Sequence, residues 1–297
     1  IPEVLSFGVL AGKTSNVLGS WNALGIFAGF SVLLTLLIIE FFSTTKIEKL
    51  VLQLLGILSL VFVAIVNFQF VWELIGISSL VIFVYKLSTS SLVASGDEDD
   101  ENQEDNKKGY FPTFSFIVIL VSLMFFISGQ FIGGFLPEHF DVSNTEIRPS
   151  FTATMSVTKA VLKESPILGV GPNKFEEAWA MHKPIGVNSG QFWNVSFSSG
   201  SGLLPTFAST TGYLGILAWL VFFTLLIVAG VRSIFSSIKE GANWETMAFF
   251  VLSLYLFVSA LFYSTGSVIF LLALAFTGVF VGLSSSRSSD EEISFSF

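Results

Sequence analysis

The sequence predicts an all-α, polytopic integral membrane protein with about seven transmembrane helices and one large helical extracytoplasmic loop. Of its 297 residues, 52% are apolar and only 12% are charged, about half the charged share of soluble domains. The uncharged stretches are long, and the charged residues gather in the segments between them. This composition excludes an ordinary soluble domain.

Seven uncharged stretches have about the 20 residues that a helix needs to cross a hydrocarbon core of roughly 30 Å. Two pairs are tight hairpins, because only Asn67 and its neighbours separate the second stretch from the third, and residues 263–266 separate the sixth from the seventh. The first four spans belong to residues 1–135 and the last three to residues 211–284. The predicted limits are 22–42, 48–66, 68–86, 112–135, 211–231, 246–263 and 265–284.

The positions of Lys and Arg predict the orientation, because short cytoplasmic loops retain positive charge during insertion. With the connection at 43–47 inside, the short connections on the cytoplasmic side are basic, and the two hairpin turns on the other side carry no Lys or Arg. Residues 136–210 then form one extracytoplasmic loop, which is long enough to be exempt from the rule. The cytoplasmic set is Lys46, Lys49, Lys86, Lys107, Lys108, Arg232, Lys239 and Arg287.

Two polar segments are expected to be cytoplasmic linkers. Residues 95–109 contain the run DEDDENQED, which is too acidic and self-repelling to bury surface and is expected to be disordered. Residues 285–297 form a polar tail. The sequence begins at Ile1 without Met and without the pattern of a signal peptide, so we expect it to be a piece of a longer protein.

The residue counts exclude several kinds of site. The chain has no Cys and only two His, which excludes disulfides, thiolate metal sites and a His-only catalytic zinc site. No metal or cofactor is therefore expected. A formal net charge of -8 argues against nucleic acid as a partner, because such binding needs a basic surface.

The loop at 136–210 concentrates the charged residues that lie between spans, and chemistry is expected there. The segment IRPSFTATMSVTKAVLKESP has the spacing of an amphipathic helix, with Pro149 suited to its first turn and Pro166 at its end. A Gly-rich turn, ILGVGPNKF, and a second short helix, FEEAWAMHK, follow. The turn lacks both the Walker pattern and a preceding strand, so a nucleotide-binding loop is excluded.

The order of these features resembles a known family. Arg148, the amphipathic helix, SPILGVGPNKF, an irregular stretch and LLPTFASTTGYLGILAWL follow one another as in the large periplasmic loop of the O-antigen ligase and polymerase family. Upstream, GKTSNVLGSWNALGIFAGF is similar to that family's Arg-containing motif before a membrane helix. The resemblance runs from Lys13 to Leu217. It implies a GT-C-like glycosyltransferase of the bacterial inner membrane, of which this chain would be the C-terminal part.

The resemblance also implies roles for individual residues. In the family, two Arg stabilise the diphosphate leaving group and one His acts as general base for the acceptor hydroxyl. Arg148 matches the loop Arg, the upstream Arg corresponds to Lys13, and the His position falls on Ser201. Lys13 keeps the positive charge but loses the bidentate fork of Arg. The alternative for Arg148 is a simple ion pair with Glu146 or Asp141.

Further candidates carry more than one interpretation each. His182 is a candidate general base from a neighbouring stretch, or an interfacial His without a chemical role. Glu73, about six residues into the third span, lines a lipid-glycan cavity or pairs with a basic residue, or else it sits in the headgroup layer. Asn188 and Ser201 bind sugar hydroxyls or satisfy irregular backbone. Trp193 stacks on a sugar or belongs to the aromatic belt.

Through the resemblance, the sequence predicts transfer of a glycan from undecaprenyl diphosphate to a hydroxyl of an acceptor glycan or lipid. The expected partners are this lipid-linked glycan, the acceptor and membrane lipids. Ser201 in place of His and Lys13 in place of Arg keep a second hypothesis open, a non-catalytic protein that binds lipid-linked glycan or scaffolds an envelope complex. A solute transporter is a weaker third hypothesis, because no internal repeat is evident.

Overall fold

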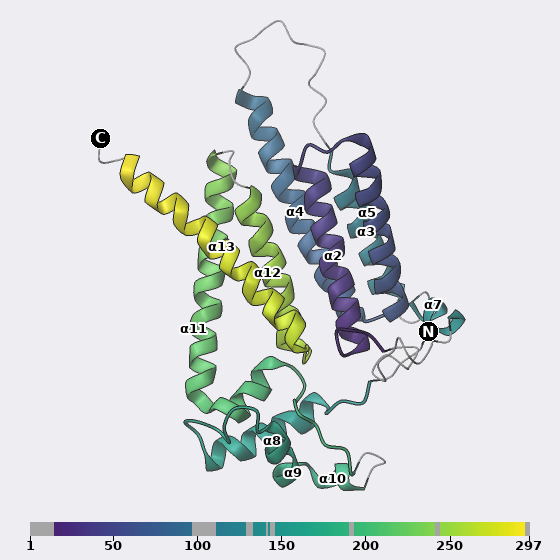
Figure 1. Cartoon of the computed structure of the whole chain (residues 1–297), viewed down its shortest axis with the longest axis vertical. Helices are drawn as coiled ribbons and strands as arrows, with labels where there is room; N and C mark the ends of the chain where they lie inside the picture. Colours follow the sequence, from purple (N-terminus) through teal and green to yellow (C-terminus); the bar gives the residue numbers. More distant parts are fainter. Residues whose placement is uncertain are drawn as a thin grey trace, which may run out of the picture. The chain divides into compact units, whose positions relative to one another are not determined.

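The chain is all-α in the part that the structure describes. The computed structural model describes residues 15–96, 111–128, 133–140, 142, 146–189, 193–240 and 244–294. Six of its helices are long and apolar enough to cross a membrane, so the protein is a polytopic membrane protein, as predicted (Figure 1). They are α2 (Trp21–Phe41), α3 (Lys46–Val66), α4 (Gln69–Gly96), α11 (Leu203–Glu240), α12 (Trp244–Phe262) and α13 (Ser267–Ser294).

Two predicted segments are compared with the helices observed. The fourth predicted span, 112–135, contains the apolar helix α5 (Thr113–Ser128), and residues 129–132 of that span lie outside the described residues. The polar tail predicted from residue 285 continues α13 as helix through Ser294, because each residue added to a formed helix adds one hydrogen bond. Residues 97–109 of the predicted acidic linker lie outside the described residues.

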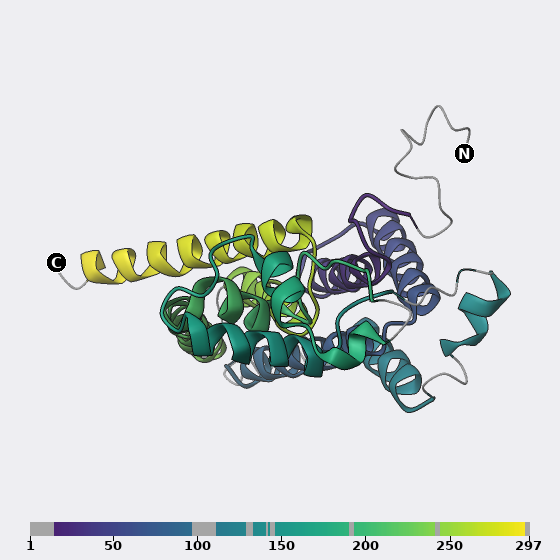
Figure 2. The same ribbon diagram turned by 90° about the horizontal axis from the view of Figure 1, so that it is seen from below.

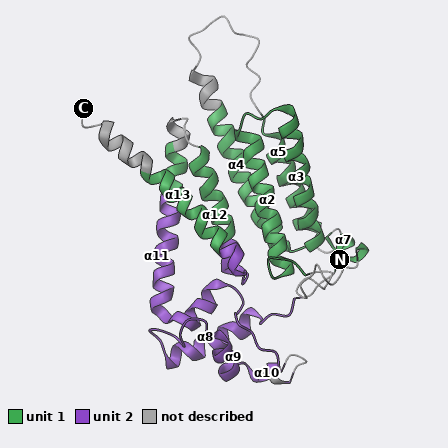
Figure 3. Ribbon diagram, viewed as in Figure 1, with its two compact units in different colours: residues 1–144, 230–256, 271–297 green, residues 145–229, 257–270 purple. Residues whose placement is uncertain are grey.

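The chain divides into two compact units (Figure 3). Unit 1 comprises residues 1–144, 230–256 and 271–297, and unit 2 comprises residues 145–229 and 257–270. Helices α11, α12 and α13 therefore contribute residues to both units.

Helix α2 is the central helix of unit 1, in contact with α3, α4 and α5 (Figure 1, Figure 2). The parts of α12 and α13 in this unit also pack on it: the Tyr255 hydroxyl donates to the Ile26 carbonyl at 2.9 Å, and the rings of Phe30 and Phe276 meet edge to face at 5.1 Å. A side chain on Gly29 would collide with Tyr255. Small residues at such positions let membrane helices approach closely.

A buried acid links α2 to α5 within unit 1. Glu40 is 4% exposed, and its Oε1 accepts hydrogen bonds from both the backbone N–H and the hydroxyl of Ser115, each at 3.2 Å. Ser115 lies in the first turn of α5, where backbone N–H groups have no partner inside the helix. The carboxylate therefore supplies that partner and fixes the start of α5 against α2.

Unit 2 contains the two helices predicted for the loop, α8 (Phe151–Glu164) and α9 (Phe175–His182), which are confirmed. The Ser150 hydroxyl accepts from the Ala153 N–H at 3.1 Å and caps α8. The short α10 (Ile185–Asn188) follows α9, whereas α7 (Phe135–His139) belongs to unit 1. The apolar faces of α8 and α9 form one small core of Ala153, Val157, Val161, Phe175, Ala178 and Trp179.

Helix α11 is interrupted at Gly212, whose φ of 66° and ψ of -162° are not helical. The Gly-rich turn after α8 docks on this interruption: the Tyr213 N–H donates to the Pro166 carbonyl at 2.8 Å, and the Val170 N–H donates to the Ser209 carbonyl at 2.9 Å. A Cβ on Gly212 would collide with the backbone of that turn. The turn thus pairs with backbone groups that the interrupted helix leaves free.

Candidate functional site

The candidate site is built around Arg148, which stands just before the cap of α8. Its Nε lies 3.5 Å from Glu146 Oε2, and its guanidinium carbon lies 4.2 Å from the centroid of the Tyr263 ring. The Tyr263 hydroxyl donates to the same Glu146 oxygen at 2.5 Å. Tyr263 directly follows α12, so a membrane helix and the loop both position the guanidinium.

The contacts of Arg148 leave the two terminal nitrogens of its guanidinium available to a ligand. The ion pair with Glu146 uses Nε, and within the described ranges no protein group pairs with either terminal nitrogen. The Arg148 side chain is 35% exposed, whereas that of Glu146 is 12% exposed. Two terminal N–H pairs in one plane match the oxygens of a phosphate, and guanidinium keeps its charge at every physiological pH. The arrangement is therefore suited to binding an anionic oxygen pair.

The segment that contains Ser201 lies against the same connection, the residues between α12 and α13. The Ser264 hydroxyl donates to the Ser199 hydroxyl at 2.8 Å. Gly202, with φ of 87°, sits so close to the carbonyl of Leu261 that a Cβ would collide with it. The structure thus brings Arg148 and the neighbours of Ser201 to one turn.

Ser201 itself is held through its backbone. Its N–H donates to the Thr154 hydroxyl of α8 at 3.0 Å. The next turn of α8 makes a similar contact, because the Thr158 hydroxyl donates to the Pro205 carbonyl at 2.9 Å. Hydrogen bonds therefore join the beginning of α11 and the residues before it to α8, and the first turn of α8 follows Arg148.

His182 is not brought to Arg148. Its Nε2 lies 3.6 Å from Oε2 of Glu164, the last residue of α8. Arg148 precedes the first residue of that helix, and 14 residues with a rise of 1.5 Å each separate its two ends by about 20 Å. His182 is therefore held at the far end of α8, beyond hydrogen-bond reach of a group bound to Arg148.

The remaining loop candidates contribute little to this site. The side chain of Trp193 is exposed. Its backbone carbonyl accepts a hydrogen bond from Lys183 Nζ at 2.6 Å. Asn188 ends α10, and its side chain lies outside the described part of the chain. Lys13 also lies outside the described residues.

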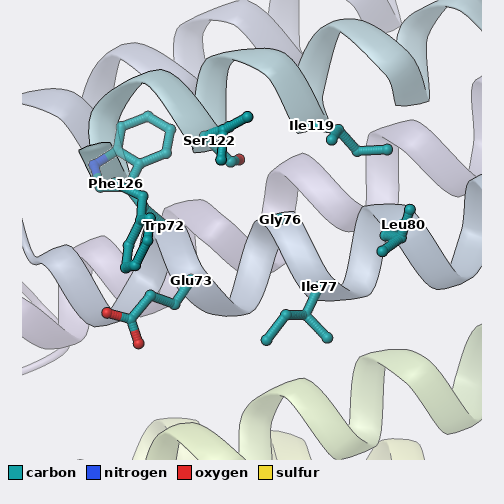
Figure 4. Close-up of a pocket in the computed structure, with 9 residues that line it drawn as sticks. Trp72, Glu73, Gly76, Ile77, Leu80, Ile119, Ser122 and Phe126 are labelled. Atoms are coloured by element: carbon teal, nitrogen blue, oxygen red, sulfur yellow. The ribbon is translucent and has the colours of Figure 1, made fainter. Parts of the chain in front are cut away.

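Glu73 lines a groove in unit 1, between α4 and α5 (Figure 4). The groove has a volume of about 490 Å³. Glu73 is the fifth residue of α4, about 6 Å along the helix from its start. Of the three interpretations of Glu73, pairing with a basic residue is not observed, because no described residue forms an ion pair or hydrogen bond with its carboxylate.

Sequence reasoning missed Tyr263 as a site residue and treated Glu146 only as an alternative partner of Arg148. Tyr263 is separated from Arg148 by more than a hundred positions, and in the sequence it is one aromatic residue at the end of an apolar stretch. The available signal was topological: the predicted orientation puts the 263–266 turn and the loop on the same side of the membrane.

No protein-family model matches the chain, and no match is found among curated proteins. The function is therefore argued from the residues of the site. Those residues offer a fixed, partly exposed guanidinium at the junction of a membrane helix and a polar loop, next to hydroxyl groups of Tyr263 and Ser264. Such a site can bind a phosphate-bearing group and hydrogen-bond neutral polar groups beside it.

Proposed function

We propose that the protein is an O-antigen ligase-like glycosyltransferase of the bacterial inner membrane. It moves a glycan from undecaprenyl diphosphate to an acceptor hydroxyl on the outer face of that membrane, without a metal. The observation that carries the proposal is the Arg148 guanidinium, held by Glu146 and Tyr263 with both terminal nitrogens unpaired within the described residues. The order of the loop motifs, which resembles that family, supports it.

The chemistry requires charge stabilisation at the leaving group. The acceptor oxygen forms a bond to sugar C1, the bond from C1 to the diphosphate oxygen breaks, and the electron pair leaves with the diphosphate. The Arg148 fork binds the oxygens on which that negative charge grows, and the acceptor hydroxyl gives up its proton to a base. The hydroxyl-lined turn beside Arg148 is suited to hydrogen bonds with a neutral sugar.

Substitution of Arg148 tests the proposal. With purified protein and an undecaprenyl diphosphate-linked glycan, we expect Arg148→Ala to lower the transfer rate by about a hundredfold or more. Arg148→Lys retains part of the rate, since it keeps the charge and loses the fork. Lys163→Ala removes an exposed cation from α8 and serves as the matched control. Transfer by Arg148→Ala at the rate of the control would refute the role of Arg148.

A second candidate function is binding of lipid-linked glycan without transfer. It is favoured by the residues of unit 2, where Ser201 stands at the position of the family's His and His182 lies beside Glu164 at the other end of α8. The same preparations distinguish the two functions. Tight binding of the lipid-linked glycan that depends on Arg148, with no product in the presence of acceptor, identifies the binding protein.

A further inference from the structure

The groove between α4 and α5 has an acid at one end and is mostly apolar along the rest of its length. Trp72 and Glu73, from the first turns of α4, stand at one end, and Leu80 and Ile119 stand at the other (Figure 4). From Trp72 to Leu80 the helix rises about 12 Å. Because α4 is a membrane span, the groove begins near its end and runs toward the middle of the hydrocarbon layer.

Three polar groups lining this groove have no partner among the described residues. Trp72 Nε1 and Ser122 Oγ are buried without a hydrogen bond, in side chains that are 1% and 2% exposed. The third polar group is the Glu73 carboxylate, which forms no ion pair with a described residue. Unpaired buried polar groups are rare because their desolvation is costly, and acids within membrane spans are retained for a function. Together they indicate that the groove has a polar ligand.

Charge decides which kind of lipid fits. A carboxylate attracts an ammonium group and repels a diphosphate, so the groove does not suit the headgroup of the proposed glycan donor. The indole N–H donates to a phosphate or ester oxygen, whereas a carboxylate accepts from an N–H. A zwitterionic headgroup with a primary amine offers both. The apolar remainder, lined by Ile77 and Leu123 among others, matches a hydrocarbon chain.

We propose that this groove is a binding site for a phospholipid with a primary-amine headgroup, such as phosphatidylethanolamine. The ammonium group pairs with the Glu73 carboxylate, an ester or phosphate oxygen faces Trp72, and one acyl chain lies along α4 toward Leu80. The site belongs to unit 1 alone, and the inference is independent of the proposed transferase function.

Lipid retention by the whole chain tests this site. The protein is reconstituted in nanodiscs with equal parts of phosphatidylethanolamine, phosphatidylcholine and phosphatidylglycerol, and the lipids that remain bound are identified by native mass spectrometry. We expect enrichment of phosphatidylethanolamine on the unsubstituted protein. Glu73→Gln lowers that enrichment by about tenfold, the size of one charged hydrogen bond. Ile77→Trp, which fills the groove from a 63% exposed position, lowers retention of every lipid class.

Two matched substitutions serve as controls. Glu138→Gln removes an exposed acid of α7 in the same unit, and Val84→Trp adds an indole to a lipid-exposed position of α4 that does not line the groove. Both retain the lipid pattern of the unsubstituted protein. Size-exclusion profiles and thermal unfolding show whether each variant is folded.

Four outcomes overturn the inference. Unchanged enrichment in folded Glu73→Gln removes the carboxylate from headgroup recognition, and equal retention of phosphatidylcholine shows that a primary amine is not recognised. Retention without any headgroup preference means that the groove holds ordinary solvating lipid. Dimers that carry no lipid and are lost in Ile77→Trp identify a second copy of the chain as the occupant.

Discussion

The contacts of the Arg148 side chain determine the orientation of its guanidinium group. The Glu146 carboxylate engages Nε, and the Tyr263 ring lies against the face of the guanidinium. Both contacts restrict rotation of a long side chain, which lowers the entropy lost when a ligand orders it. The Tyr263 hydroxyl in turn fixes the carboxylate. The three residues therefore act together, although Arg148 alone is proposed to touch the donor.

Removing the Tyr263 hydroxyl should weaken this arrangement without removing the ring. In Tyr263→Phe, Glu146 Oε2 loses its 2.5 Å hydrogen bond and keeps the Arg148 Nε at 3.5 Å, and one hydrogen bond to a charged group contributes about 1.5–3 kcal/mol. We expect a lower midpoint of thermal unfolding in detergent. Tyr213→Phe, at an exposed tyrosine of the same unit, is the control. Equal midpoints for the two variants would show that the Tyr263 hydroxyl contributes nothing to stability.

The site was partly predictable at the scale of single residues. The sequence indicates Arg148 as a candidate because it opens an amphipathic helix in a recognisable order of motifs. It does not indicate Tyr263, because a hydrophobic stretch does not reveal which aromatic residue at its end faces a distant loop. His182 is a reasonable candidate by residue type, and only its position beside Glu164 shows that it belongs to the other end of α8.

At the scale of elements, hydropathy predicts helices well and predicts their interactions poorly. All seven predicted spans contain a helix, because an apolar stretch in lipid must satisfy its backbone internally. The contact of Glu40 with Ser115 is different: the two residues are 75 positions apart, and nothing local distinguishes Glu40 from an acid that extends to the headgroups. The bend at Gly212 was hidden because glycine is also common in straight membrane helices.

The bend in α11 gives a prediction for Gly212. Its backbone conformation is one that only glycine adopts readily, and a Cβ would meet the carbonyl of Ile167. We expect Gly212→Ala to destabilise the protein by about 1–3 kcal/mol. Gly278→Ala is the matched control in α13, where a Cβ meets no atom and helix propensity favours alanine by up to about 1 kcal/mol.

Thermal unfolding of the two alanine variants measures this difference. Limited proteolysis of the loop adds a local readout, since the Gly-rich turn is docked on the bend by backbone hydrogen bonds such as Tyr213 N–H to Pro166. Faster cleavage near that turn in Gly212→Ala is expected. If Gly212→Ala matches Gly278→Ala in both measurements, the bend is not a structural requirement.

At the scale of the whole molecule, loop contacts and charge distribution are consistent with one topology. Within unit 2, Arg148 contacts Tyr263 and Ser199 contacts Ser264, so the loop lies on the same side of the membrane as the connection between α12 and α13. The distribution of Lys and Arg independently predicts that shared side to be the outer one. The proposed transfer from undecaprenyl diphosphate requires that orientation.

The chain contains no Cys, so single-cysteine labelling can test this orientation. Ser43→Cys lies in the exposed connection between α2 and α3, and Lys163→Cys lies on the exposed face of α8. Lysines close to Ser43 are retained in the cytoplasm during insertion, whereas the long loop is translocated whatever its charge. In intact spheroplasts, a membrane-impermeant maleimide should therefore label Lys163→Cys at once and Ser43→Cys only after lysis. The reverse pattern would place Arg148 inside the cell, where a donor presented on the outer face cannot reach it.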